Sequence, residues 1–257
     1  MSKNAKIAVI VSVLAVIVLL VVLSSTVFSV RKANLVWYNT PTGTLANLSN
    51  NMVLKSSKLE ANSVFLLDKN KAIENLEEKY PDMRIIDIEI CWPNEVKIHA
   101  IQRQEVYAIR VANGRIAIMD EYFKVLNVVS AFSSTKTNAI LLNTNEYENK
   151  YVSKADQVDI FGSKVYTDIY TAFMELGRNL ADMRAIIANA EITETTLTLN
   201  THFNSKILLA QPFANTTAKM RLALKTFDMC TAEDYKNSTI QVFVNNRDLL
   251  ESRFIKE

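Results

Sequence analysis

The first thirty residues contain the longest apolar stretch of the chain. Residues 7–30 read IAVIVSVLAVIVLLVVLSSTVFSV and carry no charge, Pro or Gly. Coiled as a helix, such a stretch would cover roughly 36 Å, whereas the hydrocarbon core of a bilayer is about 30 Å thick. It exceeds the apolar part of a signal peptide, and no small-residue cleavage site follows it. The pattern therefore predicts an uncleaved transmembrane helix at 7–30, preceded by a tail at 1–6.

Charges flank this stretch on both sides. Lys3, Lys6 and the amino terminus slightly outweigh Arg31 and Lys32. Positive charge is enriched on the cytoplasmic side of membrane helices, so this balance favours a cytoplasmic N-terminus. We therefore expect a single-pass type II protein of the cell membrane, with a cytoplasmic tail and the bulk of the chain outside the cytoplasm.

An α/β pattern follows a polar spacer or first strand at 31–49. A short helix is expected next, and Asp68 then provides a good N-cap for a second helix that ends at Pro81. From Arg84 to Trp92, isoleucines alternate with other residues, which predicts a half-buried strand. The residues expected to face the core from this strand are Ile86, Ile88 and Ile90.

Turn residues separate the strands that come next. Trp92-Pro93-Asn94 has turn chemistry, and Asn113-Gly114 predicts a tight turn between strands at Val106–Val111 and Ile116–Met119. Trp92 has two interpretations, since an exposed aromatic can anchor a partner, whereas a Trp beside Pro can also cap a small core. In the strand between the two turns, the residues expected to share one face are Val96, Ile98 and Ala100.

The second half of the chain mixes strands with longer helices. The predicted helices cover about Ser163–Met183 and about Pro212–Phe227. The predicted strands lie at Ala139–Leu142, in two runs near Ala190–Asn200 and Lys206–Ala210, and at Ile240–Val244. Nothing after Asn246 is apolar enough to predict a further strand.

Four segments match the recurring pattern of one family. They are Asn62-Ser-Val-Phe65-Leu-Leu67-Asp68, Pro81-Asp-Met-Arg-Ile-Ile86, Trp92-Pro93-Asn94 and Gln102-Arg103-Gln-Glu105-Val106. Together with the N-terminal apolar stretch, their order resembles the FtsQ/DivIB family of bacterial division proteins. The chain departs from the family pattern at four positions, where the family usually has Glu, Pro, Gly and Gly: Gln102, Glu105, Phe123 and Ala210.

The resemblance implies a fold and a function. The fold would be α+β: a single N-terminal transmembrane helix, a POTRA-like α/β domain at 50–120, a β-rich α+β domain at 121–246 and a tail at 247–257. The function would be that of a non-enzymatic scaffold at the division septum. Such a scaffold binds membrane proteins of the FtsB/DivIC and FtsL type and thereby influences septal peptidoglycan synthesis.

The composition of the chain limits the classes of partner and ligand that it can bind. The chain has 29 basic and 27 acidic residues, and two of the basic ones but no acidic one precede residue 31. The rest therefore has no formal net charge, which makes it a poor electrostatic partner for nucleic acid or anionic lipid. Cys91 and Cys230 form no disulfide framework or metal motif, so we expect two largely buried thiols. Four scattered glycines make no phosphate loop, and we expect no cofactor, metal or small-molecule substrate.

Catalytic chemistry has little support in the residues. His99 and His202 are expected to be surface histidines, and Asp87 with Glu89 would face solvent rather than form a glycosidase pair. One enzymatic alternative is an anchored, sortase-like transpeptidase, because His99, Cys230 and Arg247 occur in the order that such enzymes use. Two non-enzymatic classes also fit an anchored chain: another POTRA-containing envelope-assembly protein, and a glycosylated type II protein with acceptor sequences at Asn47, Asn215 and Asn237.

A partner-binding site is predicted at the last strand. If Ile240–Val244 ends the fold, it is an edge strand with unpaired backbone groups, to which a partner can add a strand. The FtsQ/DivIB resemblance places FtsB-type recognition at the same end of the β-domain. The predicted contact residues are Val242, Phe243, Val244 and, as an aromatic anchor, Phe254. The alternative is that Val242 and Val244 belong to the core and Phe243 is an isolated surface aromatic.

Overall fold

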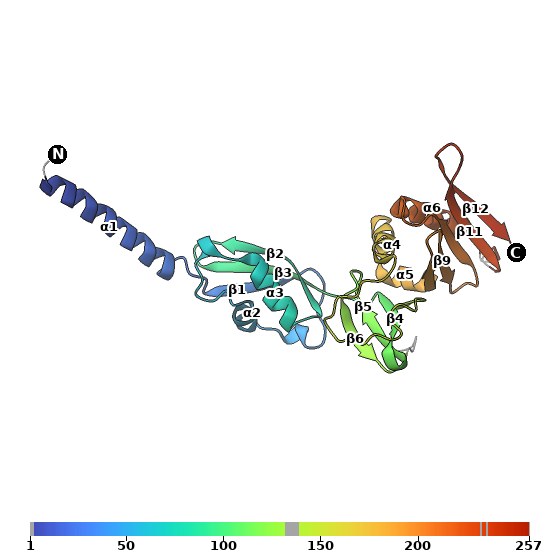
Figure 1. Ribbon diagram of the computed structural model, residues 1–257, viewed down its shortest axis with the longest axis horizontal. Coiled ribbons are helices and arrows are strands. Elements are labelled where there is room, and N and C mark those ends of the chain that lie inside the picture. Colours follow the sequence, from blue (N-terminus) through green and yellow to red (C-terminus); the bar gives the residue numbers. More distant parts are fainter. Residues whose placement is uncertain (1–2, 132–138, 232, 235, 257) are drawn as a thin grey trace. The chain divides into compact units, whose positions relative to one another are not determined.

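A computed structural model describes residues 3–131, 139–231, 233–234 and 236–256, with backbone alone at 3–9 and 23–25 (Figure 1). The side chains of Lys3 and Lys6, part of the predicted tail at 1–6, therefore lie outside the described residues. The chain divides into two compact units, Met1–Arg103 and Gln104–Glu257.

The helices are α1 (Lys3–Thr26), α2 (Asn50–Ser57), α3 (Lys69–Lys79), α4 (Ser163–Glu175), α5 (Leu180–Ile186) and α6 (Thr216–Met229). The strands are β1 (Lys32–Trp37), β2 (Met83–Cys91), β3 (Glu95–Gln102), β4 (Tyr107–Val111), β5 (Arg115–Met119), β6 (Val125–Val129), β7 (Ile140–Leu142), β8 (Ile187–Ile192), β9 (Thr196–Thr201), β10 (Lys206–Ala210), β11 (Ser238–Val244) and β12 (Leu250–Lys256).

The apolar N-terminal stretch forms α1. Among the residues that the structure describes, no helix is both long and apolar enough to cross a membrane. That finding corrects the transmembrane helix predicted at 7–30, although the α+β class of the remaining chain is confirmed. The helix ends at Thr26, and Ser29 and Val30, the last residues of the predicted span, are buried in unit 1.

Unit 1 contains a three-stranded sheet in the order β1-β3-β2. The central strand β3 runs parallel to β1 and antiparallel to β2. The N-cap expected at Asp68 is confirmed, since its carboxylate accepts the Lys71 N–H at 3.0 Å and α3 ends before Pro81. Val96, Ile98 and Ala100 share one face of β3, as predicted, and the structure shows that this face is fully buried.

The predicted alternation in β2 is only partly right. Ile88 is fully buried, but Ile86 is 47 % exposed and Ile85 takes the buried place. The register of β2 against β3 shifts between Ile85 and Asp87, which is a β-bulge. A bulge inserts one residue into a strand and so moves the following side chains to the opposite face, which alternation in the sequence does not reveal.

Unit 2 contains a nine-stranded sheet in the order β12-β11-β10-β9-β8-β7-β4-β5-β6. The predicted hairpin around Asn113 is present, with that residue at φ +63° between β4 and β5. Because β4 pairs with β7, this hairpin belongs to the second sheet. The division between the units therefore falls after Arg103, not after residue 120.

The helices of unit 2 share its apolar core. Side chains from α4, α5 and α6 pack with those of the sheet, and α4 lies beside α6 (Figure 1). The single helix predicted at Ser163–Met183 is two helices. Gly177, at φ +71°, follows the first, and Asn179 begins the second with a capping box to Asp182. The helix α6 is the crossover between the parallel strands β10 and β11.

Candidate functional site at the open edge of the large sheet

The last strand of the fold is β12, not β11. It pairs antiparallel with β11 in unbroken register, from Ser238 opposite Lys256 to Val244 opposite Leu250. The tail predicted at 247–257 is therefore wrong over most of its length. The sequence does not show this strand clearly, because only Leu250, Phe254 and Ile255 in it are apolar. Pairing with β11 supplies the stabilisation that its own composition lacks.

The register shows which backbone groups of β12 face outward. At the hairpin turn the Asn245 N–H donates to Leu249 O at 2.9 Å, so these two opposite residues form a hydrogen-bonded pair. In an antiparallel ladder such pairs alternate with pairs whose N–H and C=O groups point away from the partner strand. The residues whose backbone groups point away from β11 are therefore Leu250, Ser252, Phe254 and Lys256.

One face of the hairpin packs against α6. Phe254 lies opposite Ile240, and Ser252 lies opposite Val242. The Thr226 hydroxyl of α6 donates to the Ser252 hydroxyl at 2.8 Å. Val242 is fully buried, so it belongs to the core, as the alternative interpretation held. Phe254 remains 37 % exposed, because it lies on the outermost strand.

The other face of the hairpin carries Phe243. Its ring lies under the Arg253 guanidinium, with 4.7 Å between the Arg253 Cζ and the ring centroid. Phe243 pairs with Glu251, whereas Val244 pairs with Leu250 on the α6 side. The predicted contact residues Phe243 and Phe254 thus lie on opposite faces of the sheet. Sequence reasoning missed Ser252, Arg253 and Ile255 as edge residues, although the alternation of 250–256 was available as a signal.

The other sheet edges are interrupted or partly covered. At β6, the Val125 N–H donates to Asp156 O at 2.9 Å and Val125 O accepts the Ala155 N–H at 2.8 Å. At β1, the Leu35 N–H donates to the side chain of Asn50 at 3.0 Å. The edge strand β2 contains the bulge and exposes Asp87 and Glu89. A bulge is one of the devices by which proteins prevent pairing at an edge. The strand β12 also exposes charges, at Arg253 and Lys256, but it pairs with β11 in unbroken register without a bulge.

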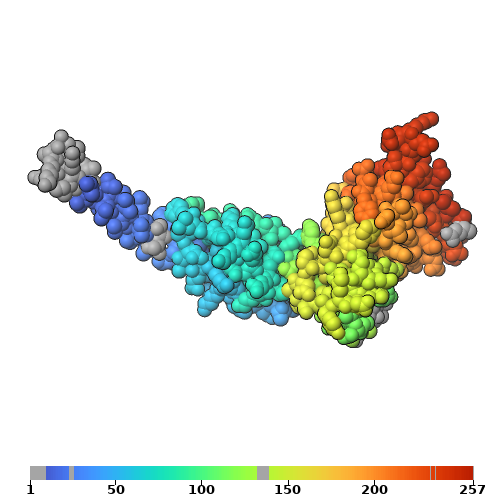
Figure 2. Space-filling view, viewed as in Figure 1, coloured from blue at the N-terminus to red at the C-terminus, as the bar shows by residue number. Residues whose placement is uncertain are grey.

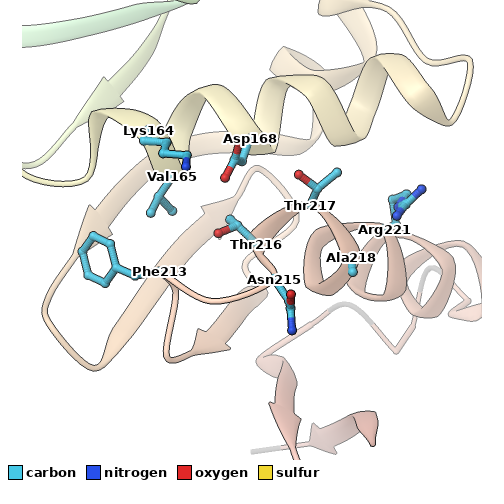
Figure 3. Close-up of a pocket in the computed structure, with 9 residues that line it drawn as sticks. All are labelled: Lys164, Val165, Asp168, Phe213, Asn215, Thr216, Thr217, Ala218 and Arg221. Atoms are coloured by element: carbon cyan, nitrogen blue, oxygen red, sulfur yellow. The ribbon is translucent and has the colours of Figure 1, made fainter.

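Unit 2 also has a cleft beside α4 and α6. It has a cavity volume of about 370 Å³, and Figure 3 shows Lys164, Val165 and Asp168 of α4 facing the start of α6 across it. The remaining lining residues are Phe213, Asn215, Thr216, Thr217, Ala218 and Arg221. Arg221 pairs with Glu175 at 3.2 Å. In the described part of the chain, no group of His, Cys, Asp and Glu residues could hold a metal ion.

The residues of the sortase-like alternative do not show a nucleophile's environment. His99 belongs to unit 1, whereas Cys230 and Arg247 belong to unit 2. The Cys230 thiol donates to Thr226 O at 3.3 Å, and burial, with a smaller contribution from Asp234, raises the pKa of that thiol. A catalytic thiol needs the opposite shift. Cys91 and Cys230 both keep their thiols and are half-buried rather than largely buried.

The structure places the two histidines and Trp92 in different surroundings. His99 is half-buried and stacks on Tyr38 with ring centroids 5.6 Å apart, whereas His202 is exposed in a turn. Trp92 is 60 % exposed, so its interpretation as a core cap is wrong.

No protein-family model and no curated protein matches the chain. What the structure defines is a two-unit α+β chain whose larger sheet ends in an open edge strand.

Proposed function

We propose that this chain is a non-enzymatic scaffold of the bacterial division machinery that binds its protein partners along β12. The observation that carries the proposal is the unbroken edge of the nine-stranded sheet. Unpaired backbone groups on such an edge accept an extended segment of another protein as an additional strand. The partners are proteins of the FtsB/DivIC and FtsL type at the division septum, through which the chain influences septal peptidoglycan synthesis.

The element order supports this proposal alongside the sequence resemblance. Unit 1 has the order β1-α2-α3-β2-β3, which suits the POTRA-like domain that the resemblance implies. Unit 2 ends in the hairpin β11–β12, at the end of the β-domain where the resemblance places FtsB-type recognition. Both features arise from the chain's own topology and do not depend on any single side chain.

The side chains of β12 indicate what kind of strand would bind. Backbone bonds would provide affinity, and side chains on the two faces of the edge would provide specificity. On the α6 side, the half-exposed Phe254 suits an apolar partner residue. On the opposite side, Arg253 and Ile255 suit an acidic residue flanked by an apolar one. An amphipathic strand with alternating apolar and acidic positions would match both faces.

The test uses two substitutions at one position. Ser252→Pro removes an N–H that points away from β11, so it removes a donor from the open edge without breaking the β11–β12 ladder. Ser252→Ala keeps that N–H and removes only the hydroxyl that contacts Thr226. Binding to purified FtsB/DivIC-type and FtsL-type proteins of the same cell is measured by titration.

We expect the proline variant to lose partner binding while its melting temperature stays close to that of the alanine variant. Arg253→Pro, which removes an N–H directed at β11, should instead disrupt the hairpin itself. Undiminished binding by Ser252→Pro, or no binding of any such partner by the unmodified chain, would overturn the proposal.

A further inference from the structure

Three aromatic rings form an exposed cluster on unit 1. The ring centroids of Phe28, Phe65 and Trp92 lie 5.1 to 5.7 Å apart in edge-to-face arrangements. Phe65 is 58 % exposed and Trp92 is 60 % exposed. Leu66, beside Phe65, is 85 % exposed. Exposed apolar patches of this kind mark interaction sites.

Backbone hydrogen bonds hold the cluster in place. Phe28 O accepts the Val64 N–H at 2.8 Å, which joins the segment after α1 to the short 3-10 helix Val64–Leu66. The Arg31 N–H donates to Asn94 O at 2.9 Å, which joins the same segment to the turn that carries Trp92. The three rings therefore come from three segments that backbone hydrogen bonds join, so the fold itself holds the cluster together.

The cluster is continuous with an apolar helix and adjoins two cations. It begins directly after α1, whose exposed large residues from Ile10 to Val22 are between 49 % and 63 % exposed; Figure 2 shows the visible face of this segment, in blue, uncovered. Arg31 and Lys32 are exposed at the start of β1. The Arg31 guanidinium donates to Thr26 O at 2.7 Å, which ties this cation to the end of α1.

These features together indicate what kind of surface the aromatic cluster contacts. A helix that binds in a protein groove has one apolar stripe and a polar opposite face. Over residues 10–22 of α1, by contrast, every exposed side chain except that of Ser12 is apolar. Trp and Phe beside basic residues are typical of protein surfaces that lie at the lipid headgroups, where the rings enter the apolar boundary and the cations meet anionic lipids.

We propose that the cluster of Phe28, Phe65 and Trp92 contacts the surface of a lipid bilayer, with Arg31 and Lys32 at the anionic headgroups. This contact belongs to unit 1 and is independent of partner binding at β12 in unit 2. Failure of one proposal therefore leaves the other standing.

The two tryptophans of the chain allow a direct test. Trp92 belongs to the cluster, whereas Trp37 lies at the far end of β1, opposite Ala100. That position is about 17 Å along the strand from Lys32. Full-length Trp37→Phe leaves Trp92 as the only reporter, and Trp92→Phe leaves Trp37 as the matched control. Each variant is mixed with vesicles of phosphatidylethanolamine and phosphatidylglycerol, with or without brominated acyl chains.

We expect vesicles to shift the emission of Trp92 to shorter wavelength and brominated chains to quench it, with Trp37 left nearly unchanged. Phe65→Ser should reduce the quenching of Trp92, and Tyr38→Ser, a change at an exposed site beyond β1, should not. Equal quenching of the two tryptophans, or none of Trp92, would overturn the proposal. A blue shift without vesicles that grows with protein concentration would instead assign the cluster to self-association.

Discussion

The Arg103 guanidinium and the Glu77 carboxylate form a buried ion pair in unit 1, with 2.6 Å between Nη2 and Oε2. Their side chains are only 6 % and 17 % exposed. The second carboxylate oxygen of Glu77 accepts the Ile85 N–H at 2.9 Å, next to the bulge in β2. One carboxylate thus links α3, the bulged strand and the residue that follows β3.

Breaking this pair should destabilise unit 1 strongly. Arg103→Met leaves the Glu77 charge buried without its cation, which should cost about 3–5 kcal/mol of unfolding free energy. The control is Lys69→Met, because the Lys69–Asp87 pair is exposed and should be worth about 0–1 kcal/mol. Both tryptophans lie in unit 1, so urea unfolding followed by tryptophan fluorescence reports this unit. Similar midpoints for the two variants would contradict the prediction.

The bulge in β2 makes neighbouring isoleucines unequal. Ile88→Asp places an unpaired charge in the core and should cost several kcal/mol, enough to unfold a small unit. Ile86→Asp, at an exposed site, should change stability little, as should Glu89→Lys, within about 0.5 kcal/mol. Thermal unfolding of the three variants decides the register. If Ile86→Asp were as damaging as Ile88→Asp, the uninterrupted alternation expected from the sequence would be correct and the bulge wrong.

Tyr107 should make unit 2 sensitive to alkaline pH. Its hydroxyl donates to Tyr166 O at 2.6 Å, and burial, with a smaller contribution from Tyr166, raises the Tyr107 pKa well above its ordinary value. The unfolded chain would ionise this hydroxyl near pH 10 while the folded chain keeps it neutral. Unfolding therefore releases a proton above pH 10, and the stability that Tyr107 provides is present below that pH and lost as pH rises above it.

The measurement compares the unmodified chain with Tyr107→Phe. The variant should be less stable at pH 7 by about 0.5–1.5 kcal/mol, the contribution of one hydrogen bond. The difference in unfolding free energy between the two proteins should become smaller above pH 10, because Phe has no proton to lose. Other titrating groups cancel in this comparison. Denaturant titrations of unit 2 by circular dichroism at several pH values would show it, and a gap independent of pH would contradict it.

Lys219 anchors α6 to the end of β10. It is fully buried, and its ammonium donates to Ala210 O at 2.8 Å and to Gln211 O at 2.7 Å, while burial lowers its pKa. Lys219→Met keeps the length of the side chain but removes both hydrogen bonds, which should cost about 2–3 kcal/mol. Lys225→Met, at an exposed position of the same helix, is the control and should change stability little. Thermal unfolding of the two variants measures the difference, and equal melting temperatures would contradict this role of Lys219.

Local patterns predicted many elements well because their signals lie within a few residues. Asp68 and Pro81 bound α3, Asn113-Gly114 marks the β4–β5 turn, and the alternation of Val96, Ile98 and Ala100 identifies the buried face of β3. The failures involve competing or distant signals. Gly177 divides a continuous helical stripe, and the bulge at Ile85 reverses a face.

The candidate site was predicted only in part, because it depends on the pairing of two strands. The sequence indicated that the end of the chain forms a sheet edge, but it assigned that edge to the more apolar strand, β11. Only the pairing of Ser238–Val244 with Leu250–Lys256 shows that the polar strand is outermost. The pairing also places Phe243 and Phe254 on opposite faces, which two separate strands in a sequence do not reveal.

What the sequence determined by itself is local: the caps, the turns, the apolar faces and the α+β class, because each depends on residues within a few positions of one another. What only the tertiary structure decided is long-range: the edge at β12, the Arg103–Glu77 pair and the aromatic cluster of Phe28, Phe65 and Trp92. Each of these joins segments far apart in the chain, through hydrogen bonds and packing that form only when the sheets assemble.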